Sequence, residues 1–194
     1  LAGAVNTLAS GEDGRIYGDN TDGVGMVRDM NDNLGWQISG RRVLVLGAGG
    51  AVRGILGPLL KQRPERLLVV NRTASKAESL AELFADMGDV SGGGYELLSE
   101  GQFDLIVNGT SASMSGDLPP LPGSILSNDC CAYDMMYGAD PTPFMRWAAS
   151  EAAWAVSDGL GMLVEQAAES FCIWRGVRPD TKPVIEMIRQ SLSN

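Results

Sequence analysis

Residues 43–54 read VLVLGAGGAVRG, a short apolar run that ends in glycines and continues as a helical pattern. An apolar run of this length, bounded by glycine, is typical of a strand buried on both faces of a sheet. Gly47 allows a tight turn, Gly49 lets a pyrophosphate approach the backbone, and the helix dipole favours the anion. Strand, glycine turn and helix together predict a dinucleotide site, although Val52 replaces the third glycine of the usual pattern.

Strand and helix patterns alternate along the rest of the chain. We expect strands at 41–47, 66–70, 95–99, 103–108, 130–135 and 153–159. We expect helices at 24–34, 51–62, 75–88, 142–151, 161–176 and 182–193. This order predicts an α/β protein with a doubly wound, parallel, Rossmann-like sheet. Within the helices, Pro58 is expected to introduce a kink, and Leu80, Leu83 and Phe84 are expected on one buried face.

Composition excludes several classes of function. The 194 residues carry a net charge of −9, which argues against nucleic acid or an anionic membrane as a partner. There is no histidine, so Ser-His-Asp and Cys-His chemistry are excluded, and an acid or base must be Asp, Glu, Lys, Tyr or Cys. Cys130, Cys131 and Cys172 show no metal-ligand spacing, and we expect them in the core of a soluble, cytoplasmic protein without a membrane span.

The end of the second predicted strand indicates which dinucleotide is bound. An NAD site usually has an acidic residue there, but this chain has Asn71, Arg72 and Thr73, followed by Lys76. Arg72 can stack on adenine, and the group can hydrogen-bond a 2′-phosphate, so the sequence predicts NADP. The alternative is that Thr73 only caps the next helix while the basic side chains are solvated; Thr73 can also do both.

The stretch GDNTDGVGM, residues 18–26, offers two interpretations. Taken alone, Thr21 and Asp22 are typical of a helix N-terminus, with Thr21 as the N-cap. Alternatively, Asp22 belongs to a catalytic site that shares a proton with a substrate hydroxyl. Asp19 is expected to be a turn residue in both cases.

Six motifs occur in order: AVNTL, GDNTDGVG, GAGGAVRG, NRTASKA, YDMMY and DGLGMLVEQAA. With them the chain resembles the shikimate dehydrogenase family over nearly its whole length. The resemblance implies the reversible reduction of 3-dehydroshikimate to shikimate with NADPH, in the aromatic amino acid (chorismate) pathway. Two alternatives remain: a quinate/shikimate dehydrogenase that uses NAD, and an NADP-binding module without catalysis.

The resemblance also implies roles for individual residues. Asp22 matches the acid of a Lys–Asp catalytic pair and, with Asn6, Tyr137 and Gln166, contacts the substrate. Without the resemblance, Asn6 is an amide at a strand end, Tyr137 a ring at the core edge and Gln166 part of a solvated helix face. The implied cofactor contacts are Gly47, Ala48, Gly49, Gly50, Ala51, Asn71, Arg72, Thr73, Lys76, Thr110, Met135 and Gly159.

The resemblance further implies a division into domains. Residues 1–21 match the trailing edge of a substrate domain, 22–158 the NADP domain, and 159–194 helices that return to the substrate domain. The family's catalytic lysine and a Ser-x-Ser pair lie upstream of the AVNT motif. We therefore expect this chain alone to bind NADP(H) with little turnover, and its last two helices to lack their partner. The expected partners are shikimate or 3-dehydroshikimate and the chain's own N-terminal domain, in a monomer or homodimer.

Overall fold

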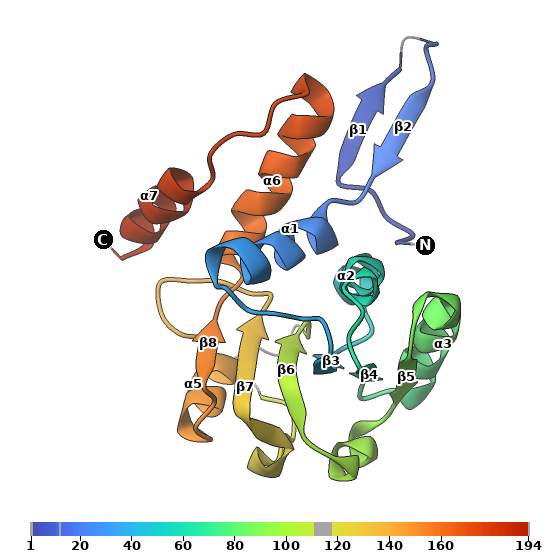
Figure 1. The fold of residues 1–194 in the computed structure, drawn as a ribbon, viewed down its shortest axis with the longest axis vertical. Helices are drawn as coiled ribbons and strands as arrows, with labels where there is room; N and C mark the ends of the chain where they lie inside the picture. The colour runs from blue at the N-terminus through green and yellow to red at the C-terminus, as the bar shows by residue number, and fades with distance from the viewer. Residues whose placement is uncertain (1, 12, 111–117, 194) are drawn as a thin grey trace.

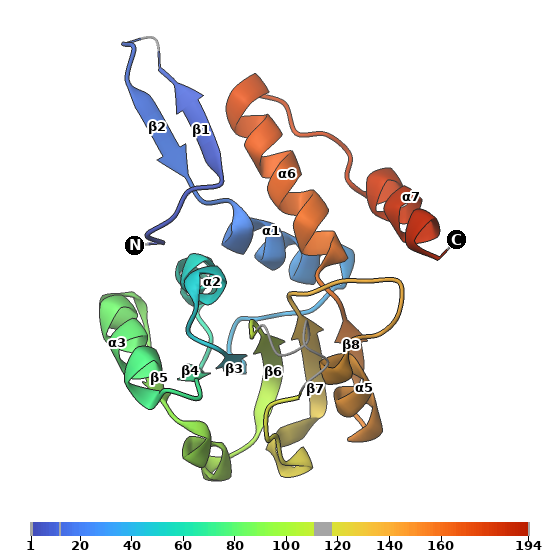
Figure 2. The same ribbon diagram turned by 180° about the vertical axis from the view of Figure 1, so that it is seen from behind.

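The computed structural model describes residues 2–11, 13–110 and 118–193. Its centre is a six-stranded parallel sheet in the order β5-β4-β3-β6-β7-β8 (Figures 1 and 2). The strands are β3 (Arg42–Leu46), β4 (Arg66–Val70), β5 (Val90–Gly93), β6 (Phe103–Asn108), β7 (Leu126–Asp134) and β8 (Ala155–Ser157). The strand order reverses between β3 and β6, which is where a doubly wound sheet opens a crevice for ligands. The predicted fold class is confirmed.

Helices cover both faces of the sheet. They are α1 (Asp22–Arg28), continued by the π-helical η1 (Asp29–Asn33), α2 (Gly50–Lys61), α3 (Ala74–Phe84), α5 (Pro143–Ser150), α6 (Leu160–Arg175) and α7 (Lys182–Leu192). Short 3-10 segments are η2 (Ala85–Met87), η3 (Tyr95–Glu100) and η4 (Gly123–Ile125). No helix in the described ranges combines the length and apolarity needed to cross a bilayer.

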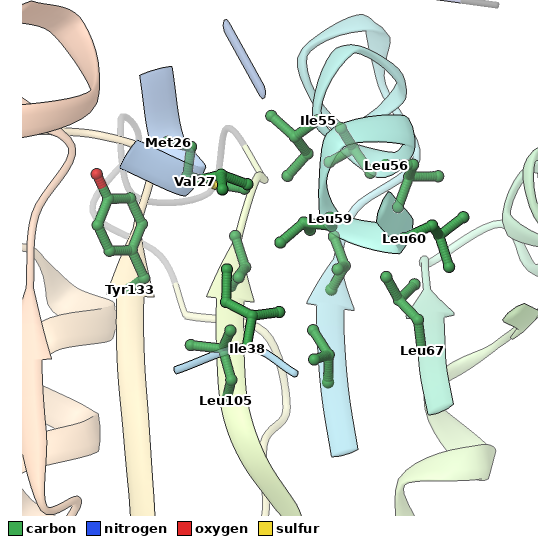
Figure 3. Close-up of a cluster of buried hydrophobic side chains, with 14 of the residues drawn as sticks. Met26, Val27, Ile38, Ile55, Leu56, Leu59, Leu60, Leu67, Leu105 and Tyr133 are labelled. Atoms are coloured by element: carbon green, nitrogen blue, oxygen red, sulfur yellow. The ribbon is translucent and has the colours of Figure 1, made fainter. Parts of the chain in front are cut away.

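Alternate side chains of each buried strand enter two separate cores. In β3, Val43 and Val45 pack under α1, α2 and α3, whereas Leu44 and Leu46 pack against α5 on the opposite face. Figure 3 shows the first core, in which side chains of α1 and α2 fill the space above the strands. This two-sided burial explains why the strand sequence is continuously apolar.

The third strand of the sheet is earlier in the chain than predicted. We expected it at 95–99, but β5 is formed by Val90–Gly93, and Tyr95–Glu100 is the 3-10 segment η3. The reason is the close approach of α3: a Cβ built on Gly92 would lie 2.2 Å from the Ala77 carbonyl oxygen. Only glycine fits between helix and strand, so a stretch that looks like a loop forms the strand.

Two smaller expectations also need correction. Leu80 and Phe84 are buried, but Leu83 is 41% exposed, because it lies outside the stripe of α3 that faces the sheet. Helix α2 is not interrupted at Pro58, whose ring packs against Gly23 of α1, and a kink there stays a prediction. Cys172 is only partly buried on α6, whereas Cys130 and Cys131 are in the core, where burial raises their thiol pKa values to about 12 and about 11.

A second, smaller group of elements lies at the C-terminal edge of the sheet. β1 (Thr7–Ser10) and β2 (Ile16–Asp19) form an antiparallel hairpin that projects beside α6, with α7 beyond it (Figure 1). The hairpin exposes Leu8, Ile16 and Tyr17, and α7 has no buried residue, with Met187 58% exposed. Val184 is also exposed on α7, whereas Ile185 and Ile188 are half-buried. That α6 and α7 lack a partner domain stays a prediction. The domain boundaries remain a prediction.

Candidate functional site

A cavity of about 620 Å³ lies at the C-terminal ends of β3, β4 and β6. Every predicted cofactor residue except Met135 and Gly159 lines it. The sheet positions them, because the carboxyl ends of parallel strands meet at one edge, beside the reversal of strand order. The lining also contains Tyr95, Gly109 and three residues of the segment 118–120 that sequence reasoning did not identify.

The glycine turn after β3 leaves its backbone open to this cavity. Gly47 has φ +101, and a Cβ there would lie 3.1 Å from the Gly109 carbonyl oxygen, so both conformation and space require glycine. A Cβ on Gly49 or Gly50 would meet no heavy atom within 4 Å. Gly49 stands at the N-cap of α2 without a capping side chain. The first-turn N–H groups of α2 are thus available to an anion such as a pyrophosphate.

The segment after β4 supplies positive charge without a carboxylate. Arg72 and Lys76 are exposed at the rim, and no acidic residue is among the described residues that line the cavity. The Asn71 side-chain amide donates to the Thr73 carbonyl at 3.0 Å, which fixes the turn. The Thr73 hydroxyl does not cap α3. This donor set fits a 2′-phosphate better than an unphosphorylated ribose, which is usually bound by an acidic side chain.

Tyr95 is a cavity residue that we did not predict, because residues 95–99 have the sequence pattern of a strand. It is half-buried at the start of η3. Burial raises the pKa of its hydroxyl, and the positive charge of Arg72 acts in the opposite direction. Tyr95 is therefore a neutral hydroxyl near the basic end of the cavity.

Buried polar residues at the ends of β6 and β7 fix the loops beside the cavity. Asn108 Oδ1 accepts from the backbone N–H of Thr110 at 3.2 Å and from its hydroxyl at 2.8 Å. The Asn108 amide donates to Asp134 at 3.2 Å, and Asp134 accepts from the Thr142 hydroxyl at 2.6 Å and the Met136 N–H at 3.0 Å. A polar residue at the end of each of two neighbouring buried strands was the signal that could have identified this pair.

Met135 and Gly159 meet next to the cavity. A Cβ on Gly159 would lie 2.3 Å from the Met135 carbonyl oxygen, and a Cβ on Gly109 would lie 3.1 Å from Met135 Sδ. The thioether therefore lies against Gly109, which lines the cavity, while Gly159 begins α6. The structure brings these two predicted residues together; they do not line the cavity, but Met135 contacts Gly109, which does.

The start of α6 is supported by buried acidic and phenolic groups. The Tyr133 hydroxyl donates to Asp29 at 2.7 Å, and the Asn33 amide donates to the same carboxylate at 3.0 Å. Burial raises the pKa of Asp29. Any side chain at Gly161 would collide with this carboxylate, so α6 rests directly on η1.

A second polar group combines three predicted substrate residues from separate elements. Asn6, just before β1, donates to Asp22 Oδ1 at 2.7 Å and to Gln166 Oε1 at 3.1 Å. Asp22 begins α1 and Gln166 lies on α6. The two helices touch closely, because a Cβ on Gly25 would lie 2.6 Å from the Gln166 nitrogen. Among the described residues, Tyr137 makes no hydrogen bond with this group, and it is 41% exposed in the loop after β7.

The expectation that the Thr21 side chain caps α1 is wrong. Thr21 occupies the N-cap position, but its side chain makes no capping bond. Its hydroxyl and its N–H instead donate to Asn6 Oδ1 at 3.1 and 3.0 Å. Asn6 can accept from this hydroxyl because the start of β1 lies beside the start of α1. Asp19 was expected in a turn but is the last residue of β2, paired with Thr7, and its side chain accepts from the Asn20 N–H at 2.8 Å.

Fold and cavity together define a doubly wound dinucleotide-binding protein, with a cluster of polar side chains contributed by Asn6, α1 and α6. Comparison with known proteins refines this class. The profile of the family described as shikimate / quinate 5-dehydrogenase matches residues 30–113, and that of the shikimate 5′-dehydrogenase C-terminal domain matches residues 159–189. The chain belongs to the shikimate dehydrogenase family, as its motifs predicted.

Individual relatives cover nearly all of the chain. A shikimate dehydrogenase (NADP(+)) of Saccharophagus degradans is 60% identical over 98% of this chain and 70% of its own length. One from Cellvibrio japonicus is 56% identical over 98% and 69%. Among solved structures, an Ael1 enzyme from Pseudomonas putida has a TM-score of 0.87 at 50% identity, covering 96% of this chain and 68% of that one. Shikimate 5-dehydrogenase from Thermus thermophilus, in complex with NADP(H) and shikimate, has a TM-score of 0.82 at 34% identity over 98% and 69%.

Proposed function

We propose that this protein catalyses the reversible reduction of 3-dehydroshikimate to shikimate with NADPH, a step of the aromatic amino acid pathway. The observation that carries the proposal is the cluster of Asn6, Asp22 and Gln166, joined by hydrogen bonds of 2.7 and 3.1 Å. An amide, a carboxylate and a second amide are suited to a substrate with several hydroxyl groups. The names of its close relatives give the same reaction partners for those proteins.

The cofactor residues fit NADP in three parts. The open turn at Gly49 and the uncapped N-terminus of α2 suit the pyrophosphate. Arg72 and Lys76, with Asn71 and Thr73, suit the 2′-phosphate, because no carboxylate in the described lining would repel it. Met135, Gly159 and Thr110 are assigned to the nicotinamide end. A bound NADPH supplies the hydride.

The protein's own residues then manage the substrate oxygen. The carbonyl that is reduced becomes a hydroxyl and needs a proton; in the oxidative direction the same proton must leave. Asp22 is assigned to hold this hydroxyl and to share its proton, while Asn6 and Gln166 orient neighbouring hydroxyls. Tyr137, on the loop after β7, is assigned to the far side of the substrate. Without a histidine in the sequence, a carboxylate takes the part that imidazole has in many dehydrogenases.

The cellular location and assembly complete the proposal. We place the protein in the cytoplasm, which its free cysteines Cys130, Cys131 and Cys172 support. Its oligomeric state, monomer or homodimer, stays a prediction, as does a partner domain against α6 and α7.

The test is turnover by the full-length protein with each alcohol and each cofactor. We expect NADPH formation from shikimate and NADP⁺, with a kcat/KM at least ten times that for NAD⁺. Faster oxidation of quinate, or equal use of NAD⁺, would favour the quinate/shikimate alternative. NADP⁺ binding without turnover of either alcohol would contradict the assignment as an enzyme.

A further inference from the structure

One face of α6 follows the start of β1 residue by residue. Gln166, Ser170 and Trp174 are four residues apart, so they lie on the same side of the helix. Each bonds a different residue of the facing chain: Gln166 bonds Asn6 at 3.1 Å, Ser170 bonds Thr7 at 2.5 Å, and Trp174 bonds the Leu8 carbonyl at 2.8 Å. The helix therefore sets the position of the segment that carries Asn6.

Hydrogen bonds from Thr7 and Thr21 fix the orientation of the Asn6 amide. Its Oδ1 atom accepts three hydrogen bonds, from the Thr21 N–H at 3.0 Å, the Thr21 hydroxyl at 3.1 Å and the Thr7 hydroxyl at 3.0 Å. The Thr21 N–H can only donate, so the amide oxygen must face it. The NH2 group consequently faces Asp22 and Gln166, where we place the substrate.

Ser170 completes this arrangement as a donor. A hydroxyl group carries one proton, and those of Thr7 and Thr21 are both directed to Asn6 Oδ1. In their contacts with Ser170 Oγ, at 2.5 and 3.2 Å, the threonine oxygens cannot donate these protons a second time. Ser170 also has a single proton, and its shortest contact, the one with Thr7 at 2.5 Å, assigns that proton to Thr7 rather than to the Gln166 carbonyl at 3.1 Å. Thr7, Thr21 and Ser170 are only 2%, 1% and 8% exposed, so bulk water does not replace a lost partner.

We propose that Ser170 is a positioning residue for substrate binding, acting through Thr7 on the Asn6 amide. The inference rests on the proposed function, because it takes Asn6 as a substrate ligand. Ser170 does not bond Asn6 itself; its proton holds the Thr7 hydroxyl in the rotamer that points at Asn6 Oδ1. Its place on α6, one turn after Gln166, ties the amides of Asn6 and Gln166 to one rigid element.

The test is Ser170→Ala in the full-length protein, with Ser191→Ala as a matched control. The Oγ atom of each serine lies near the carbonyl oxygen four residues earlier in its own helix, at 3.1 Å for Ser170 and 3.0 Å for Ser191, but Ser191 lies on α7, away from Asn6. Alanine is the better helix former, so Ser170→Ala does not weaken α6 through propensity. We expect the shikimate KM to rise about five- to tenfold, the size of one buried hydrogen bond, with kcat and the NADP⁺ affinity unchanged within about twofold.

A second variant and an activity-free measurement make the result decisive. Thr7→Val removes the hydroxyl that Ser170 bonds, and we expect an equal or larger rise in the shikimate KM. The side-chain NH2 signals of Asn6 in a ¹⁵N NMR spectrum, assigned with Asn6→Ala, should shift in Ser170→Ala and stay in place in Ser191→Ala.

An unchanged KM in Ser170→Ala, or a fall in kcat and melting temperature alone, would overturn the positioning role. So would a raised KM with undisturbed Asn6 signals, because Ser170 would then act by another route. If the unsubstituted protein does not oxidise shikimate, the proposed function fails instead. The NMR comparison still decides whether Ser170 orients Asn6.

Discussion

Arg42 and Asp104 form a two-point ion pair at the N-terminal ends of β3 and β6. Arg42 Nη2 donates to Asp104 Oδ1 at 2.6 Å and Nε donates to Oδ2 at 3.0 Å, while the Arg42 N–H reaches Oδ2 at 2.9 Å. Both side chains are more than half buried, with exposed fractions of 32% and 17%. The pair joins the two strands between which the strand order reverses, at the edge opposite the cofactor cavity.

This pair predicts a pH-dependent contribution to stability. The Arg42 guanidinium holds the pKa of Asp104 well below its usual range. A depressed pKa stabilises the folded state above the unfolded value of about 4, and this stabilisation is lost as the pH falls. We expect Asp104→Asn to lower the free energy of unfolding by about 1–3 kcal/mol at pH 7 and by progressively less below pH 4. Urea titrations across pH measure this. A difference that grows toward acid would contradict it, and kcat should be unaffected.

The cofactor preference should depend on Arg72. We expect Arg72→Ala to weaken NADPH binding about 10- to 100-fold, because charge-assisted hydrogen bonds to a phosphate are lost, and to leave NADH binding nearly unchanged. Fluorescence titration of the two reduced cofactors gives both affinities. Arg41→Ala is the control, since Arg41 precedes β3 at the opposite edge of the sheet. An equal loss for both cofactors would show that Arg72 acts on adenine or on the fold rather than on the 2′-phosphate.

Proton transfer should depend on Asp22. We expect Asp22→Asn to lower kcat by about 10²–10⁴, the usual contribution of a positioned acid or base, with the NADP⁺ affinity preserved. Steady-state rates with shikimate and a separate NADP⁺ titration measure the two effects. The control is Asp19→Asn, at the end of β2, which should retain most of its activity. If turnover survives in Asp22→Asn, the carboxylate has only a structural role at the start of α1.

Alanine substitutions at two helical glycines, Gly25 in α1 and Gly57 in α2, should change the stability of the fold in opposite directions. A Cβ on Gly25 would lie 2.6–2.9 Å from Gln166, so we expect Gly25→Ala to destabilise the fold by about 1–3 kcal/mol and to raise the shikimate KM. The atoms nearest to a Cβ on Gly57 would belong to Phe84 and Met87, at ordinary contact distances of 3.6–3.9 Å. Gly57→Ala should stabilise α2 by about 0.5–1 kcal/mol through helix propensity. Thermal unfolding and shikimate kinetics separate the two; a stabilising Gly25→Ala would refute the contact.

Local sequence patterns were sufficient to predict most strands of the sheet. The apolar runs of β3, β4 and β6 are buried on both faces, so their sequences carry an unambiguous signal. β5 could not be predicted in this way, because its glycines make room for α3, and that packing is not visible in the strand's own sequence. Leu83 fits the helical period of α3 but faces solvent for a similar reason: the neighbouring elements decide which stripe is covered.

In the candidate site, too, some residues could be predicted from local sequence patterns and others could not. The turn at Gly47 and the segment at Arg72 could be predicted, because each motif is contiguous and follows a recognisable strand. The grouping of Asn6, Asp22 and Gln166 came only from the resemblance, since 160 residues separate the outer two. Ser170 has no sequence signal at all; its place beneath Asn6 depends on the packing of α6 against the hairpin.

Gly159, the N-cap of α6, lies against Met135, and the middle of the helix carries Gln166 and Ser170. One helix thus connects the residues that we assign to the nicotinamide with an amide that we assign to the alcohol. We expect a ligand that displaces the first turn of α6 to displace this amide as well, which links the binding of the two ligands thermodynamically. Linkage is mutual: the factor by which NADP⁺ changes shikimate affinity must equal the factor by which shikimate changes that of NADP⁺.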